Sequence, residues 1–354
     1  MSTLTDNLGL VKHASGYEGW GDDMNANLDK IDAEFNRIMY SSNPIINGDM
    51  SNWQRGTFGF APGFFNADRW RSYAYSGSFT VNRVAFSPGQ TDVPGEPEFY
   101  MNHYIKTPGD ITVEQFIEDV RIYANQLVSF SFWTYVDNET SLEMVLFGQY
   151  FGTGGSDAVF TGAVLDNPLL YAGWNYVTGY CNIPSINGKT IGLYSCLSFR
   201  IDISPIYTGN WGLSQVSINN GSTSYPFKPR PKALEEILCK RYCQVLNADG
   251  THAYPEIGSG FTTSTSNAFL TVHLPVPMRN TPTLSYSGSW LLTDENCVNY
   301  IIDSFWIDSP RTNAKQGLIG LNGYSPSAAY ATAKYVEAYG NNDTNCRMIF
   351  NSEF

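Results

Sequence analysis

The sequence has few charged side chains, and the basic ones are outnumbered by the acidic ones. Charged residues make up 15% of the 354 positions, and 33 Asp and Glu outnumber 21 Lys and Arg, which gives a formal net charge of −12. Proteins that bind nucleic acid neutralise phosphates with clustered Lys and Arg, and such clusters make the binding domain basic. An acidic chain with so few cations is therefore not expected to bind nucleic acid.

Long apolar runs are also missing. The sequence contains no stretch of 18 or more apolar residues, the length that a membrane-spanning helix needs. The first thirty residues have neither the basic start nor the apolar centre of a secretory signal peptide. We therefore expect no membrane insertion, and synthesis in the cytoplasm without a signal peptide.

Signatures of catalysis are absent, and histidine is scarce. The four histidines lie in unrelated contexts, and neither G-x-S-x-G nor H-E-x-x-H occurs. The six cysteines are scattered along the chain, so we expect free thiols in a reducing compartment. The sequence thus names no catalytic residue, no metal ligand and no cofactor. Only the neighbouring side-chain oxygens of Asn47 and Asp49 leave a structural calcium open.

Aromatic residues, glycine and proline are abundant and predict a mainly β protein. The chain has 15% aromatic residues, 32 Gly and 18 Pro, a composition typical of short strands joined by tight turns. The clearest strand runs from Val128 to Val136, where alternate residues are apolar and predict one buried face. Similar, less regular runs across about 180 residues favour a jelly-roll β-sandwich over residues 43–228.

A second β module is expected after a proline-rich stretch. Prolines between Ser224 and Pro231 rule out a helix or a central strand there, so we place a domain boundary at this point. Residues 229–354 then form a smaller C-terminal β-sandwich module preceded by a short helix. One face of that helix is predicted to carry Leu234, Ile237, Leu238, Tyr242 and Val245.

Residues 22–40 carry a helical repeat that predicts self-association. The a and d positions of about two heptads are occupied by Met24, Leu28, Ile31, Phe35 and Ile38. Leucine at a with isoleucine at d favours three or four strands over two, so a homotrimeric coiled coil is expected. An ordinary amphipathic helix packed on its own domain is the alternative.

The polar segment before this helix cannot bury enough surface to fold alone. It is predicted to dock on a partner, and with the helix it makes up the N-terminal unit 1–42, although a merely disordered terminus fits the composition as well. The residues expected to make the attachment are Leu8, Leu10 and Trp20.

These residues resemble bacteriophage virion proteins of the tail-fibre or receptor-binding type. Four matches carry the resemblance. In the N-terminal segment they are Asn7-Leu-Gly-Leu10, Gly19-Trp-Gly21 and Asn25-x-Asn-Leu-Asp-Lys-Ile31, and at the entry of the jelly roll they are Asn43-Pro-Ile-Ile-Asn-Gly-Asp49, Trp53-Gln-Arg-Gly56 and Ala67-Asp-Arg-Trp70. The third match is Phe116-Ile-Glu-Asp-Val-Arg121 with Phe130-Ser-Phe-Trp133, and the fourth is Glu235-Glu-Ile-Leu-Cys-Lys-Arg-Tyr242 with Pro275-Val-Pro-Met-Arg-Asn-Thr-Pro-Thr283. The resemblance implies a trimeric, non-enzymatic virion component, attached to other virion proteins through its N-terminal segment and made in the host cytoplasm. Tail and capsid attachment both stay open.

Three functions follow as hypotheses. The first is a virion fibre protein that displays its β modules to host-surface glycans, since an exposed aromatic ring offers an apolar face on which a sugar can stack. The side chains expected to contact such a glycan are Trp53, Trp133, Trp211, Tyr254 and Tyr324. The alternatives are a passive capsid or tail decoration or adaptor protein, and a glycan-degrading enzyme whose acid pair the sequence does not identify.

Overall fold

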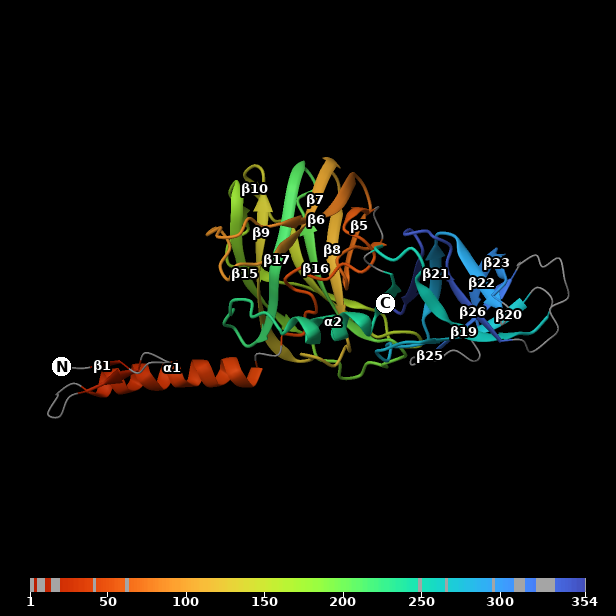
Figure 1. The fold of residues 1–354 in the computed structure, drawn as a ribbon. Coiled ribbons are helices and arrows are strands. Elements are labelled where there is room, and N and C mark those ends of the chain that lie inside the picture. Colours follow the sequence, from red (N-terminus) through yellow and green to blue (C-terminus); the bar gives the residue numbers. More distant parts are fainter. Residues whose placement is uncertain are drawn as a thin grey trace.

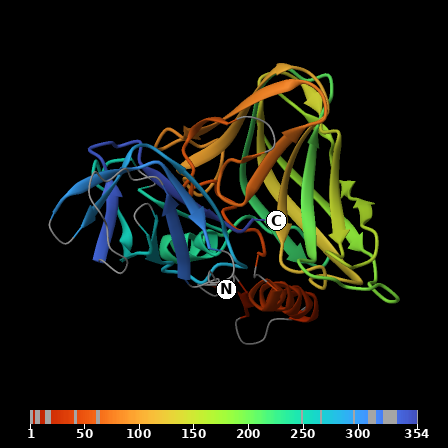
Figure 2. The same cartoon turned by 90° about the vertical axis from the view of Figure 1, so that its right-hand side faces the viewer.

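A computed structural model gives the fold of the chain. It describes residues 3–4, 10–13, 20–40, 43–60, 64–247, 250–264, 267–294, 297–308, 316–322 and 335–353. Figure 1 shows two β modules with one long helix outside them, and Figure 2 shows the modules side by side with that helix seen end-on. The prediction of a mainly β chain with a jelly-roll type sandwich is confirmed.

The first module is a sandwich of two antiparallel sheets. In spatial order, the six-stranded sheet consists of β12 (Val159–Gly162), β11 (Met144–Tyr150), β16 (Cys196–Ile203), β8 (Ile111–Ile117), β5 (Trp70–Ala74) and β4 (Phe64–Phe65). The seven-stranded sheet consists of β13 (Val164–Leu165), β15 (Gly173–Ile183), β9 (Gln126–Val136), β17 (Gly209–Asn220), β7 (Phe99–Thr107), β6 (Ser78–Ala85) and β3 (Phe58–Phe60). A short ribbon pairs β10 (Thr140–Ser141) with β14 (Leu169–Leu170).

The alternation along β9 explains how these sheets pack. Val128, Phe130, Phe132 and Val136 are fully buried between the sheets. Phe130 lies 5.5 Å from the ring of Phe199 on the opposite sheet, measured between centroids. Because side chains in a strand alternate between faces, the intervening residues of β9 are directed to the outer face of the seven-stranded sheet.

The second module has its own hydrophobic core. Its larger sheet consists, in spatial order, of β23 (Asn299–Ile302), β22 (Trp290–Asp294), β26 (Tyr335–Gly340), β19 (Glu256–Thr262), β20 (Asn267–His273), β25 (Gln316–Asn322) and β24 (Ser304–Ile307). A three-stranded sheet consists of β18 (Cys243–Leu246), β27 (Arg347–Asn351) and β21 (Thr283–Ser287). Trp290, Met348 and Phe350 are buried in a core that shares no residue with the first. The division at residues 228 and 229 stays a prediction, with one core on each side of it.

The N-terminal part forms helix α1 (Trp20–Tyr40) with a small hairpin of β1 (Thr3–Leu4) and β2 (Val11–Lys12). The Asn27 amide ties β2 to the helix, because its Oδ1 accepts the Val11 N–H at 2.8 Å and its Nδ2 donates to the Val11 carbonyl at 2.9 Å. Within the described ranges, no helix combines the length and the apolarity that crossing a bilayer requires.

Helix α2 (Lys232–Lys240) corrects two details of the predicted helix. It ends before Tyr242 and Val245, and Val245 lies in β18. Leu234 and Ile237 are half exposed, whereas Glu235 and Cys239 are buried. The predicted apolar face was wrong because Glu235 has a cation partner: Arg230 Nη1 lies 2.9 Å from Glu235 Oε2. The ion pair lets a carboxylate occupy the buried side.

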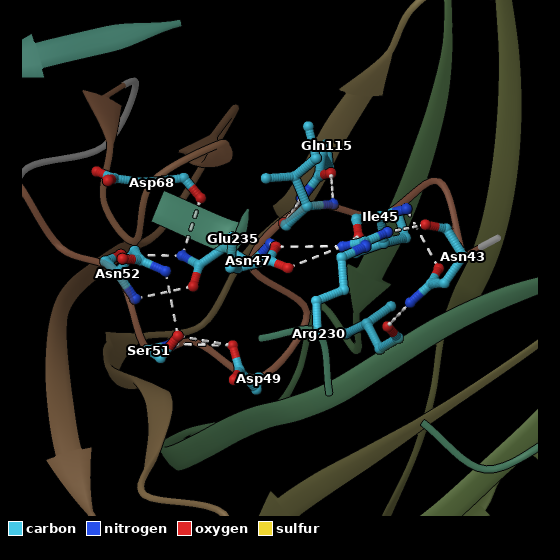
Figure 3. Close-up of polar contacts among 12 residues, drawn as sticks. Asn43, Ile45, Asn47, Asp49, Ser51, Asn52, Asp68, Gln115, Arg230 and Glu235 are labelled. Atoms are coloured by element: carbon cyan, nitrogen blue, oxygen red, sulfur yellow. Dashed lines mark hydrogen bonds and ion pairs between the residues drawn. The ribbon is translucent and has the colours of Figure 1, made fainter. Parts of the chain in front are cut away.

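Glu235 also fixes the start of the sandwich (Figure 3). Its Oε1 accepts the backbone N–H of Asn47, and Arg230 donates to the carbonyl oxygens of Asn43 and Ile45. The Asn47 side chain donates to the carbonyl oxygens of Asn52 and Asp68 at 2.9 and 3.0 Å. The segment that enters the sandwich is therefore bound to the helix that follows the sandwich.

A second group of ion pairs joins the two modules. Glu353 has a side chain only 2% exposed, and its carboxylate contacts the guanidinium groups of Arg69 and Arg55 from the first module. Glu118, just after β8, pairs with Arg241 at 2.9 Å and with Arg279 at 2.8 Å. The modules are thus connected through buried and half-buried charges as well as through the chain itself.

Candidate functional site

The outer face of the seven-stranded sheet carries a row of aromatic rings. Register places Trp133 and Tyr135 of β9 opposite Tyr176 and Trp174 of β15. The ring centroids of Trp133 and Tyr176 are 5.1 Å apart, and those of Tyr135 and Trp174 are 5.6 Å apart. Aromatic cross-strand pairs of this kind stabilise a sheet and hold each ring in a defined orientation. The strands therefore present two ordered ring pairs on one face.

The second ring pair extends into a larger cluster. Trp174 lies 5.1 Å from Tyr100 of β7 and 5.0 Å from Phe86, measured between ring centroids. Gly212 of β17 leaves the space for them, since a Cβ there would come within 2.9 Å of Tyr135 Cβ and 3.1 Å of the Tyr100 ring. Burial raises the pKa of Tyr100 and Tyr135, so both keep their phenolic protons and remain hydrogen-bond donors.

Beside the first ring pair lies a cavity of about 410 Å³. Trp133 and Tyr176 form part of its lining, and Tyr176 is 41% exposed. The remaining lining includes Pro94–Pro97 and Pro226–Pro229, segments that are far apart in the sequence. This volume falls in the range of small-ligand sites, which run from roughly 300 to 1,000 Å³.

Polar groups surround the rings in this cavity. The lining contains the acids Asp49, Glu96 and Glu98, and it also contains Lys232, whose Nζ lies 2.5 Å from Glu98 Oε1. Gln215 also lines the cavity, and its Nε2 donates to the Pro94 carbonyl at 2.7 Å. Carboxylates accept hydrogen bonds from hydroxyl groups, and aromatic rings pack on apolar C–H surfaces. The arrangement suits a neutral polyhydroxylated ligand.

Of the residues predicted to contact glycan, Trp133 alone lines this cavity. Trp53 and Trp211 are buried in the first core, 7% and 1% exposed, so their rings have no face open to a ligand and we drop them as contacts. Tyr254 is 60% exposed but belongs to the second module, where it contacts Tyr339. Tyr324 lies outside the described residues.

The cavity also contains residues that the sequence did not point to. Alternation along β15 does not say whether the Tyr176 side chain lies on the inner or the outer face of the sheet. Its pairing with Trp133 in the observed register places it on the outer face. Gln215 lies at an irregularity of β17, between Ser214 and Ser217, with a φ of +53°. Such a bulge directs a side chain away from the regular alternation, and no sequence signal marked it.

The structure also shows how Asn47 and Asp49 are used. Asn47 Oδ1 accepts the Asn52 N–H at 2.8 Å, and Asp49 Oδ1 accepts the Ser51 hydroxyl at 2.9 Å. Their oxygens thus stabilise the entry loop (Figure 3). Across the ranges that the structure describes, no group of three or more His, Cys, Asp or Glu is placed to hold a metal ion.

The predicted assembly residues lie on α1 and in front of it. Met24, Leu28 and Ile31 are 46%, 54% and 44% exposed in the single chain. The side chains of Phe35, Ile38 and Trp20, and the whole of Leu8, lie outside the described part of the structure. Leu10 is half-buried. The trimer and the virion attachment stay predictions.

The fold and the cavity together define a β-sandwich protein with an aromatic-lined cavity on one sheet. No protein-family model matches the chain, and no curated protein matches it. Among solved structures, the enzymatically active domain of tailspike protein 4 from bacteriophage CBA120 is similar at 14% identity and a TM-score of 0.31, over 51% of this chain and 21% of that one. A CBM22-2 xylan-binding domain from Paenibacillus barcinonensis is similar at 15% identity and a TM-score of 0.30, over 47% and 99%.

A Stig cyclase from Fischerella sp. TAU is similar at 11% identity and a TM-score of 0.34, over 51% of this chain and 98% of that one. Scores this low carry no argument about function. The resemblance in the sequence implied a non-enzymatic protein, yet the similar structures include a cyclase and an enzymatically active tailspike domain. The expectation that the chain is no enzyme is therefore withdrawn, and these structures assign no activity to this chain.

Proposed function

We propose that this chain is a receptor-binding virion protein of a bacteriophage, and that its first sandwich binds a host-surface glycan in the cavity beside Trp133 and Tyr176. The observation that supports this is the pairing of two ordered rings with carboxylates in one cavity of about 410 Å³. The rings offer the apolar surface on which a pyranose packs, and the acids accept its hydroxyl protons.

The N-terminal unit supplies the assembly part of this proposal. In the proposed particle, α1 forms a trimeric coiled coil, and the segment with Leu8, Leu10 and Trp20 attaches it to other virion proteins. Exposure of Met24, Leu28 and Ile31 along one helix supports the trimer, because an apolar stripe of this kind is normally covered by another surface. Figure 1 shows α1 outside both β modules, where it could meet its copies.

The test uses two tyrosines of the same strand. Tyr176→Ala removes a ring from the cavity, and Tyr180→Ala removes a similarly exposed ring of β15 that does not line it. The full chain is first applied to an array of neutral bacterial-surface oligosaccharides, and the strongest ligand is then titrated by tryptophan fluorescence. Loss of a central anchor costs about 2 kcal/mol, so Tyr176→Ala should weaken binding roughly thirtyfold. Tyr180→Ala should bind as the unchanged chain does.

An array without any ligand, or equal affinities for the two variants, would contradict glycan binding in this cavity. The proposed trimer and virion attachment would be unaffected by that result, and the decoration or adaptor hypothesis would then be favoured. Attachment is tested separately, by asking whether the isolated full chain assembles on particles that lack it.

A further inference from the structure

A second, larger cavity lies between the two modules. Its volume is about 630 Å³, and it is bounded by the outer face of the six-stranded sheet and by the loop that carries Arg279 and Asn280 of the second module. All of its lining residues belong to the described part of the chain. It lies on the opposite sheet from the cavity of Trp133, so the two would bind separate ligands.

The wall of this cavity is made by two loops in direct backbone contact. Thr153 and Leu193 exchange hydrogen bonds, with the Thr153 N–H donating at 2.8 Å and the Leu193 N–H at 3.1 Å. A Cβ on Gly152 would come within 2.1 Å of the Leu193 carbonyl oxygen, and one on Gly192 within 2.0 Å of the Thr153 carbonyl oxygen. Glycine at both positions allows this approach, which holds the wall in one shape before any ligand arrives.

Aromatic side chains cover much of the inner surface. Tyr150 of β11 packs edge-on against Phe116 of β8, with centroids 5.8 Å apart, and both line the cavity. Tyr194 is 54% exposed, and the guanidinium carbon of Arg279 lies 5.2 Å from the centroid of its ring. These rings provide apolar surface next to polar groups, as in the first cavity.

The charges differ from those of the first cavity, because this lining holds two arginines, Arg71 and Arg279, besides the acids Asp157 and Glu353. Arg71 of β5 lines the second cavity with a side chain that is 35% exposed, and its ion partner is Glu114 of β8, 3.4 Å away. Glu114 is 2% exposed, and its Oε2 has no hydrogen-bond partner among the described residues. Arg279, by contrast, is paired with Glu118 at 2.8 Å. Arg71 is therefore the cation best placed to receive an anionic group.

The ionisation of Glu114 strengthens this conclusion. Burial raises its pKa to about 7, against the attraction of Arg71 and Arg200, while Asp202 raises it further. Near neutral pH the carboxyl group is thus only partly ionised, and it neutralises the Arg71 guanidinium incompletely. Asn280 adds a second unsatisfied group, since its buried Oδ1 also has no hydrogen-bond partner among the described residues.

We propose that this inter-module cavity binds a sugar that bears a carboxylate, with Arg71 receiving the carboxylate and Asn280 accepting a hydroxyl proton. A guanidinium presents parallel N–H groups that match the two oxygens of a carboxylate. The rings of Tyr150 and Tyr194 face the apolar side of the sugar. This site and this class of ligand go beyond the neutral glycan proposed for the first cavity.

The proposal has a pH signature. The titratable and charged groups that face Glu114 are Arg71 and Tyr73 from β5, Cys196, Arg200 and Asp202 from β16, and Tyr150 from β11. Protonation of Glu114 as the pH falls through about 7 removes the negative charge beside Arg71. A sugar carboxylate remains ionised there, so its affinity should be higher at pH 6 than at pH 8.

The test titrates the full chain with sodium glucuronate, with glucose as the neutral counterpart and acetate as the bare carboxylate, by isothermal calorimetry. Glucuronate should bind at least tenfold more tightly than either. Arg71→Gln should lower its affinity at least tenfold, whereas Arg83→Gln, a half-exposed arginine on the opposite sheet, should not change it. Tyr194→Gly removes a ring while keeping a residue suited to the φ of +65°, and should weaken binding without unfolding the chain.

Equal affinity for glucuronate and glucose would overturn the proposal, as would equal binding by the Arg71→Gln and Arg83→Gln variants. Tyr176→Ala separates the two sites. If it removes neutral glycan and leaves glucuronate binding intact, both proposals hold. If glucuronate fails to bind while neutral glycan binding still depends on Tyr176, only the inter-module site is wrong.

Discussion

Replacing Glu353 with Gln tests whether the two modules depend on the charges buried between them. The Glu353 side chain is 2% exposed, and it contacts Arg69, 1% exposed, and Arg55, 12% exposed. Glutamine keeps the size of the side chain but removes its charge, which leaves two guanidinium groups without their shared carboxylate. Breaking a buried ion pair in this way costs about 3 to 5 kcal/mol. We expect Glu353→Gln to lower the stability of the folded chain by that amount.

Urea unfolding, followed by tryptophan fluorescence, measures the effect. With a slope of about 3 kcal/mol per molar, the midpoint should fall by roughly 1 to 2 M. The matched control is Glu337→Gln on β26, because Glu337 is exposed and accepts a hydrogen bond from the Tyr335 hydroxyl, and it should change stability by less than about 0.5 kcal/mol. The reasoning fails if Glu353→Gln unfolds at the same midpoint as the control. The double variant Glu353→Gln, Arg55→Gln should lose less stability than the sum of the two single losses, since both residues belong to one cluster.

Two further predictions concern acid sensitivity and assembly. Burial lowers the pKa of His103 to about 3, so its ring should show no NMR titration between pH 8 and pH 5, and a midpoint near 6.5 would contradict the buried neutral state. Because the pKa of His103 is lower in the folded chain than in the unfolded chain, its contribution to folding stability is complete above about pH 6.5 and falls at lower pH. The free energy of unfolding should therefore decline by about 2 kcal/mol between pH 7 and pH 5, and His103→Asn should make this decline smaller. Leu28→Asp puts a charge in the exposed apolar stripe of α1 and should convert a trimer into monomers, as measured by light scattering. Asp29→Asn on the same helix should leave the solution mass unchanged, and equal masses for both variants would argue against the coiled coil.

The sequence predicted strands well and their environment less well. The period of two along β9 gave the strand and its buried face, and the core confirms it through Phe130 and Phe132. The same reasoning misplaced Trp53 and Trp211, because composition shows that aromatic residues are present but not which of them other elements cover. The apolar face assigned to α2 failed for a related reason, since only the fold brings Arg230 and Asn47 to Glu235.

The two cavities could not be predicted from local patterns. The first combines Asp49, Glu98, Trp133 and Gln215, which are brought together by strand order and by a bulge in β17. The second depends on Arg71 and Glu114, which are cross-strand partners only in the observed register of β5 and β8. Register and sheet order are long-range properties, so a single sequence without its fold leaves these neighbours undetermined.

The binding of Asn43 and Ile45 to Arg230 has a mechanical consequence. The chain enters the first sandwich and leaves it at the same cluster, where Arg230 and Glu235 hold the entry segment. A pulling force applied between α1 and the second module would therefore be transmitted through this cluster and would largely bypass the strands of the sandwich. The sandwich would keep its shape under tension until the Arg230 contacts break.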